Sequence, residues 1–274
     1  MKHDIRLIAA DFDGTLLSSD GSISAFNKLM IKKAQDKGIV FAAATGRYPE
    51  NAAQIMVDEG IVCPIISTNG AVVELSPFGE RIHEQIMDAA SARKVFDVLE
   101  GFNEGYYIFG RRSVINRWTI PRHISEQNEL HLAKLKQRVT YSMGLDACKD
   151  ALATPIYKFF VIFDHDENAS KEIQAALAPL EGVEFTSSGG RNLEIMPSGT
   201  DKGKGLEVLA KHYGIAQAQM MALGDQLNDL SMIKYAGLGI AMGNAADAVK
   251  KHADAITAPF DEDGVAKAIE KYCF

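Results

Sequence analysis

Two aspartates, Asp11 and Asp13, stand two residues apart directly after the mostly apolar run 5–10. That run has the length of a buried strand and contains neither glycine nor proline. Residues two apart in an extended chain point to the same side, so the two carboxylates face together and Phe12 faces away. Two like charges this close repel unless a cation, or a proton on one of them, offsets them. The pair therefore indicates a solvated turn or a charged site, and the rest of the chain must decide.

Polar residues also follow other predicted strands: Thr45 follows the run 39–44, and Asp225, Asn228 and Asp229 follow the run 220–223. In an open parallel sheet, ligands bind outside the carboxyl ends of the strands. Asp11, Asp13, Asp225 and Asp229 would together build an oxygen-rich, strongly negative pocket. Such a pocket suits Mg²⁺, a hard cation that favours phosphate partners.

A site for phosphate also needs positive charge and amide donors. Lys202 begins a predicted helix, whose first amides favour anions, although alone it would be an ordinary exposed lysine. Thr45 supplies a hydroxyl beside the Gly46 amide, and the amides of Phe12 and Asp13 lie next to the first aspartate. Carboxylate, Mg²⁺, lysine and hydroxyl are what phosphoryl transfer through a carboxylate nucleophile requires.

The elements that position these residues follow an α/β pattern. Predicted strands alternate with helices at 24–37 and 49–59, which is typical of parallel βαβ units with right-handed crossovers. Asn69-Gly70 predicts a two-residue hairpin turn before a returning strand. The same alternation of predicted strands and helices returns near the C-terminus.

Between these two parts the residue composition changes. The middle segment is richer in charged and aromatic residues and contains the single tryptophan, Trp118. A strong strand at 157–163 and a helix at 169–180 fall in this segment. We predict an α/β fold in which a Rossmann-like parallel sheet forms a catalytic core from residues 1–85 plus 191–274. Residues 86–190 would form a separate α/β lobe inserted into that core.

Composition excludes several classes of function. The net charge of -7 lacks the global basic footprint of a nucleic-acid-binding protein. No stretch approaches the roughly eighteen apolar residues of a membrane span, and the N-terminus lacks signal-peptide organisation. The three scattered cysteines indicate reduced thiols. We therefore expect a soluble cytoplasmic protein that binds neither nucleic acid nor a membrane.

Four segments resemble, in order, the four motifs of the haloacid dehalogenase superfamily: Asp11-Phe12-Asp13-Gly14-Thr15-Leu16, Thr45-Gly46-Arg47, Lys202-Gly203 and Gly224-Asp225-Gln226-Leu227-Asn228-Asp229. The chain is most similar to the Cof-like phosphatases, which insert an α/β cap between the second and third motifs. The resemblance therefore implies that residues 86–190 are an inserted α/β cap domain. The segments 67–71 and 193–195 also resemble that subfamily. One departure is Asp201, where a small hydroxyl residue is commoner.

The resemblance implies a role for each matching position. Asp11 attacks phosphorus and forms an aspartyl-phosphate, while Asp13 protonates the leaving oxygen and then activates water. Asp11, the Asp13 main-chain carbonyl and Asp225 hold Mg²⁺, and Asp229 orients Asp225 or the bound waters. The phosphoryl oxygens are held by Phe12, Thr45, Gly46, Lys202 and Asn228.

The function implied is a Mg²⁺-dependent phosphatase that hydrolyses small phosphomonoesters, such as sugar phosphates or phosphorylated cofactors. Its partner would then be a small phosphorylated metabolite. The alternatives are a phosphomutase, which would pass the phosphoryl group between sugar hydroxyls, and a non-catalytic module that binds phosphometabolites. Arg47 would meet a substrate anion or form a structural ion pair. Candidates for specificity in the cap are Tyr107, Arg111, Arg112 and Trp118. Their ordinary interpretation is cap core for the two aromatic residues and solvated charges at strand ends for the two arginines.

Overall fold

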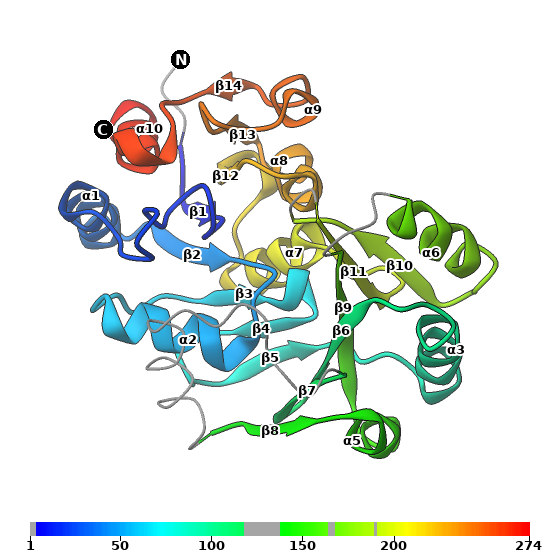
Figure 1. Cartoon of the computed structure of the whole chain (residues 1–274). Coiled ribbons are helices and arrows are strands. Elements are labelled where there is room, and N and C mark those ends of the chain that lie inside the picture. The colour runs from blue at the N-terminus through cyan, green and yellow to red at the C-terminus, as the bar shows by residue number, and fades with distance from the viewer. Residues whose placement is uncertain (1–3, 118–137, 164–167, 189–190) are drawn as a thin grey trace. The chain divides into compact units, whose positions relative to one another are not determined.

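The structure is a computed structural model and describes residues 4–117, 138–163, 168–188 and 191–274. The chain divides into two compact units, the first made of residues 1–84 and 201–274 and the second of residues 85–200. Each unit is built on its own sheet (Figure 1). The sequence candidate Trp118 lies outside the described residues.

The first unit contains an eight-stranded sheet of order β14-β13-β12-β1-β2-β3-β4-β5. Its strands are β1 (Leu7–Ala10), β2 (Val40–Ala44), β3 (Ile65–Ser67), β4 (Val72–Glu74), β5 (Arg81–Glu84), β12 (Met220–Gly224), β13 (Leu238–Ala241) and β14 (Ala255–Ile256). The six strands from β14 to β3 run parallel, and β4 and β5 continue the sheet antiparallel. This confirms the predicted α/β fold with a parallel sheet.

Helices cover both faces of this sheet because its central strands are apolar on both sides. In β1, Ile8 and Ala10 pack into one core cluster, and Leu7 and Ala9 pack into another on the opposite face. The first cluster includes side chains of α1 (Ala25–Asp36), α2 (Pro49–Asp58), α9 (Asp247–Lys250) and α10 (Gly264–Cys273). The second includes side chains of α7 (Lys202–Tyr213) and α8 (Leu230–Tyr235). Burial on both faces explains why the strand sequences do not alternate with polar residues.

Four short 3₁₀ helices complete the first unit: η1 (Thr68–Gly70), η2 (Gln217–Gln219), η3 (Leu227–Asp229) and η4 (Phe260–Glu262). The prediction of a two-residue hairpin turn between β3 and β4 was wrong. Ser67 pairs with Val72, so four residues form the connection instead of two. The difference arises because the chain turns through η1, in which Asn69 has a left-handed backbone.

The second unit contains a six-stranded sheet of order β10-β11-β9-β6-β7-β8. Its elements are β6 (Gly105–Gly110), β7 (Ser113–Asn116), β8 (Thr140–Met143), β9 (Ile156–Ile162), β10 (Val183–Thr186), β11 (Asn192–Pro197), α3 (Ala89–Leu99), α5 (Leu145–Ala151) and α6 (Ala169–Leu177). One face of the sheet carries an apolar core that includes Val95, Phe159 and Ile173. Tyr107 lies on β6, and Arg111 and Arg112 lie in the turn between β6 and β7.

The second boundary of the inserted segment differs from the prediction. We expected residues 191–200 in the core, but β11 pairs antiparallel with β9 and with β10. These residues therefore belong to the second unit, and the chain returns to the first unit at residue 201. The strand was misplaced because its apolar pattern fits either sheet, and only its hydrogen-bonded neighbours decide between them.

Two further expectations concern location. Among the described residues, no helix is long and apolar enough to cross a membrane. All three cysteines, Cys63, Cys148 and Cys273, are free thiols. Burial raises the pKa of Cys63 to about 12, and it raises the pKa values of the other two to about 11. These thiols therefore stay protonated and unreactive at neutral pH.

Candidate active site

Three adjacent strands of the first unit deliver the predicted site residues to one edge of the sheet. Asp11 follows β1, Thr45 follows β2 and Asp225 follows β12, and β1 lies between the other two strands. All three strands are parallel, so their carboxyl ends meet at the same edge. The position is the one at which open parallel sheets bind ligands.

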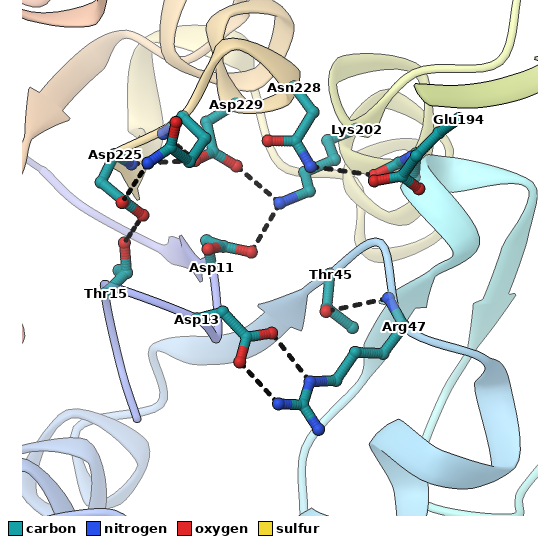
Figure 2. Close-up of polar contacts among 12 residues, drawn as sticks. Asp11, Asp13, Thr15, Thr45, Arg47, Glu194, Lys202, Asp225, Asn228 and Asp229 are labelled. Carbon is teal, nitrogen blue, oxygen red and sulfur yellow. Dashed lines mark hydrogen bonds and ion pairs between the residues drawn. The ribbon is translucent and has the colours of Figure 1, made fainter. Parts of the chain in front are cut away.

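A buried lysine connects two of the acidic groups (Figure 2). Lys202 Nζ donates to Asp11 Oδ1 and to Asp229 Oδ1, each at 2.6 Å, and the lysine side chain is 0% exposed. Lys202 is the first residue of α7, whose N-cap Asp201 accepts a hydrogen bond from the Lys204 amide at 2.8 Å. Asp201, the departure from the family pattern, therefore caps the helix in the way a serine or threonine would.

Asp225 lies beside this ion pair and against Gly14, a residue of the loop that follows β1. Thr15 Oγ1 donates to Asp225 Oδ1 at 3.1 Å. Gly14 has φ +80°, and a Cβ atom there would lie 2.4 Å from Asp225 Oδ2. Any side chain at position 14 would displace Asp225, so Gly14 lets the loop after β1 approach the loop after β12.

Asp229 holds the Asp225 loop in place. Its Oδ2 accepts hydrogen bonds from the main-chain amides of Asp225 and Gln226, at 2.8 Å and 2.9 Å. With Oδ1 bound to Lys202, both carboxylate oxygens of Asp229 have protein partners. Asp229 therefore connects Lys202 to the main chain of the Asp225 loop.

The acidic groups are compact enough to hold a cation. Oxygens of Asp11, Asp225 and Asp229 lie within 4.8 Å of one another, and all three residues are buried. Three carboxylates against one lysine leave excess negative charge in a desolvated place, which is costly unless a further cation binds. The donors are all oxygen, as Mg²⁺ prefers, so these residues fit the predicted metal.

Their pKa values report the same excess charge. Burial raises the pKa of Asp11 well above its ordinary value, the neighbouring Asp229 raises it further, and Lys202 opposes the shift. Burial, helped by Asp229, raises the pKa of Asp225 to about 6. Burial opposes the charged form of Lys202, but the two carboxylates outweigh it and raise its pKa. The buried cluster therefore carries more negative charge than Lys202 neutralises, and a bound cation would offset the excess.

Asp13 points to a different partner. Its side chain is 58% exposed and forms a two-pronged pair with Arg47, whose Nε and Nη2 donate to the two carboxylate oxygens at 2.7 Å and 2.5 Å. Arg47 Nη1 donates to Asn51 Oδ1 at 3.2 Å. Of the two roles considered for Arg47, this structure contains the ion pair.

The remaining predicted phosphate-binding residues lie in the same loops. Thr45 is buried, and its hydroxyl accepts a hydrogen bond from the Arg47 amide at 3.1 Å. Gly46 stands between them, and the Phe12 ring packs into the core beneath the turn. Asn228, in η3, donates to Asn69 Oδ1 at 3.1 Å.

Asn244 is a site residue that the sequence reasoning missed. Its Nδ2 donates to the Gly14 carbonyl at 2.8 Å and to Asp225 Oδ2 at 3.4 Å, and its Oδ1 accepts from the Phe260 amide at 3.1 Å. Asn244 follows β13, which neighbours β12. The rule that identified Asp11, that polar residues at strand ends are candidates, would also have identified Asn244.

Comparisons with known proteins agree with this fold. The sequence profile of a family described as haloacid dehalogenase-like hydrolase matches residues 8–269. A Bacillus subtilis protein, Phosphatase YwpJ, is 33% identical, and the match covers 96% of this chain and 98% of that one. A second protein from the same organism, 5-amino-6-(5-phospho-D-ribitylamino)uracil phosphatase YcsE, is 30% identical over 98% of this chain and 96% of its own.

A solved structure of a haloacid dehalogenase-like hydrolase from B. subtilis superimposes with a TM-score of 0.85 at 28% identity, and the match covers 97% of this chain and 99% of that one. This chain belongs to the haloacid dehalogenase-like hydrolase family. Within it, the chain is a Cof-like phosphatase.

Proposed function

We propose that this phosphatase hydrolyses small phosphomonoesters through an aspartyl-phosphate on Asp11, and that it depends on Mg²⁺. The observation that carries the proposal is the buried Lys202 ammonium, which is bonded to Asp11 and Asp229 next to Asp225. A lysine so placed offsets the charge of a carboxylate nucleophile and of an approaching phosphate dianion.

Asp11 is the nucleophile in this reaction, and Asp13 is the general acid and base. An Asp11 oxygen forms a bond to phosphorus as the ester P–O bond breaks, and the Asp13 proton passes to the leaving oxygen. In the second half, the Asp13 carboxylate takes a proton from water as the water oxygen bonds to phosphorus. The Asp11–phosphorus bond then breaks, which releases inorganic phosphate and restores Asp11.

The other residues orient the phosphoryl group. Lys202, the Thr45 hydroxyl and the Asn228 amide supply donors to its oxygens, together with the main-chain amides of Phe12 and Gly46. Asp11, Asp225 and the Asp13 carbonyl would hold Mg²⁺, and Asp229 would orient Asp225. When bound, the metal would neutralise charge on the phosphoryl oxygens.

The curated relatives suggest where to begin with substrates. YcsE is named for 5-amino-6-(5-phospho-D-ribitylamino)uracil, and an HMP-PP phosphatase from Serratia proteamaculans is 27% identical over 89% of this chain and 86% of its own. Both names describe small phosphorylated metabolites. We propose a substrate of this class, acted on by residues of the first unit with the second unit as the cap that selects it, in the cytoplasm.

The proposal is tested with purified protein and a panel of phosphomonoesters that contains these compounds and common sugar phosphates. Rapid acid quench with a ³²P-labelled substrate should trap label on the peptide that carries Asp11. EDTA should abolish phosphate release and Mg²⁺ should restore it. Indifference to EDTA, or label on another peptide, would contradict the proposal, while turnover without free phosphate would favour the phosphomutase.

A further inference from the structure

We propose that Asn69 is a positioning residue that aligns Asn228 and the Thr45 loop for phosphoryl binding. The inference rests on the proposed function, which assigns Thr45 and Asn228 to the phosphoryl oxygens. Asn69 itself was not among the predicted site residues, and no role for it follows from the reaction chemistry.

The backbone around Asn69 has an unusual conformation. Thr68, Asn69 and Gly70 have successive φ values of +50°, +52° and +98°. Only glycine adopts the left-handed region freely, and asparagine tolerates it better than most side chains, whereas a β-branched threonine rarely does. Strained backbone of this kind persists where surrounding contacts hold it, and it gathers at functional sites.

Main-chain hydrogen bonds attach this turn to the loop after β2. The Asn69 amide donates to the Thr45 carbonyl at 3.0 Å, and the Thr68 amide donates to the Arg47 carbonyl at 2.9 Å. Two consecutive left-handed residues point their amides toward the same segment. The strained conformation therefore fixes the backbone on both sides of Gly46.

The Asn69 side chain fixes a second element. Asn69 Oδ1 accepts from Asn228 Nδ2 at 3.1 Å, and both residues are buried. A primary amide has two N–H donors in one plane, so the direction of the first sets the direction of the second. An acceptor at Asn69 also selects the orientation of Asn228 that presents N–H groups, which a phosphoryl oxygen needs.

The turn also packs against the start of α7. A Cβ atom on Gly70 would lie 2.1 Å from the Asp201 carbonyl oxygen, next to Lys202. The turn Thr68–Gly70 thus contacts the Thr45 loop, the Asn228 turn and the N-terminus of α7, the helix that carries Lys202. We infer that it sets the spacing of donors contributed by three separate segments.

The test is a double-mutant cycle read by isothermal titration calorimetry with orthovanadate in Mg²⁺ buffer. Asn69→Gly removes the acceptor but keeps the amide and the left-handed backbone, and it should weaken vanadate binding about tenfold. Asn228→Ala should weaken binding by a similar factor. The double variant should bind no more weakly than Asn228→Ala alone, because Asn69 acts through Asn228.

Asp263→Gly is the matched control, because Asp263 is another left-handed non-glycine residue, φ +59°, at the start of α10. It should keep wild-type vanadate affinity. If Asn69→Gly does not fold, as judged by its melting transition, Asn69→Ala takes its place in the cycle.

Wild-type vanadate affinity in the Asn69 variant, or losses that add in the double variant, would overturn the inference. A wild-type protein that neither hydrolyses a phosphomonoester nor binds vanadate would instead overturn the proposed function. The two failures are therefore distinguishable in one set of measurements.

Discussion

Lys202 Nζ lies 2.6 Å from Asp11 Oδ1, although 191 positions separate the two residues in the sequence. The lysine also reaches Asp229, so a single ammonium partners two buried carboxylates. Removing one partner of a buried ion pair leaves an uncompensated charge and costs about 3–5 kcal/mol. This contact therefore links the stability of the first unit to the proposed chemistry.

We expect Lys202→Met to lower the free energy of unfolding by about 3 kcal/mol and to weaken orthovanadate binding at least about tenfold. Urea unfolding and calorimetry measure the two effects. Lys204→Met is the control, because Lys204 lies on the same helix but is exposed and pairs with Glu207. Unchanged vanadate affinity in the Lys202 variant would remove this lysine from the phosphate site.

Asp11→Asn should separate stability from turnover. The substitution removes the nucleophile, so phosphate release should fall by at least about 10³-fold. It also removes from the acidic cluster a carboxylate whose ionised form burial disfavours, so the melting temperature without metal should equal or exceed that of wild type. Measurable residual hydrolysis, with the protein folded, would show that another group attacks phosphorus.

In the metal-free protein, the acidic cluster should contribute less stability as the pH rises. The pKa of Asp225 is raised from 3.8 to about 6, so the folded state holds this proton more tightly than the unfolded state. The resulting stabilisation is complete below about pH 4 and is lost as the pH rises through about 6, an effect on the order of 2 kcal/mol. The raised pKa of Asp11 acts in the same direction.

Thermal melts at about pH 5 and pH 7.5 test this linkage, with Asp225→Asn as the variant whose melting temperature should change less. Because Mg²⁺ binds the ionised carboxylates, it should raise the melting temperature more at the higher pH. A larger metal effect at the lower pH would count against these carboxylates as ligands.

Arg47→Ala should impair chemistry more than stability. The Arg47 side chain is 35% exposed and Asp13 more so, and ion pairs this exposed contribute at most about 1 kcal/mol. If the guanidinium holds Asp13 in place for proton transfer, kcat should fall about tenfold with alkyl phosphates. The loss should be smaller with p-nitrophenyl phosphate, whose leaving group departs without a proton.

Arg47→Lys keeps the charge but not the two-pronged geometry, and it should restore little of the lost rate. A loss confined to KM and equal for all leaving groups would instead show that Arg47 binds the substrate anion.

The sequence predicted the parallel core and the meeting of Asp11, Thr45 and Asp225, because buried strands produce apolar runs and their polar ends share an edge. Lys202 was predicted to belong to the site because it begins a helix, whose first main-chain amides favour anions. Other features depend on contacts between distant segments and leave no local pattern. Asn69 meets Asn228 across 159 positions, and Arg47 meets Asp13 across 34. The strand at 192–197 was assigned to the wrong sheet for the same reason.

The discontinuity of the first unit has a consequence for how the chain emerges from the ribosome. Strand β1 pairs with β2 on one side and with β12 on the other, and β12 is made only after the whole second unit. At roughly 5–20 residues per second, the wait lasts on the order of ten seconds. During that time the edge of β1 that will pair with β12 has no partner, and both faces of the strand are apolar. Exposed surface of this kind is what chaperones protect. The second unit is continuous in sequence and can finish folding while the half-built sheet still lacks its centre.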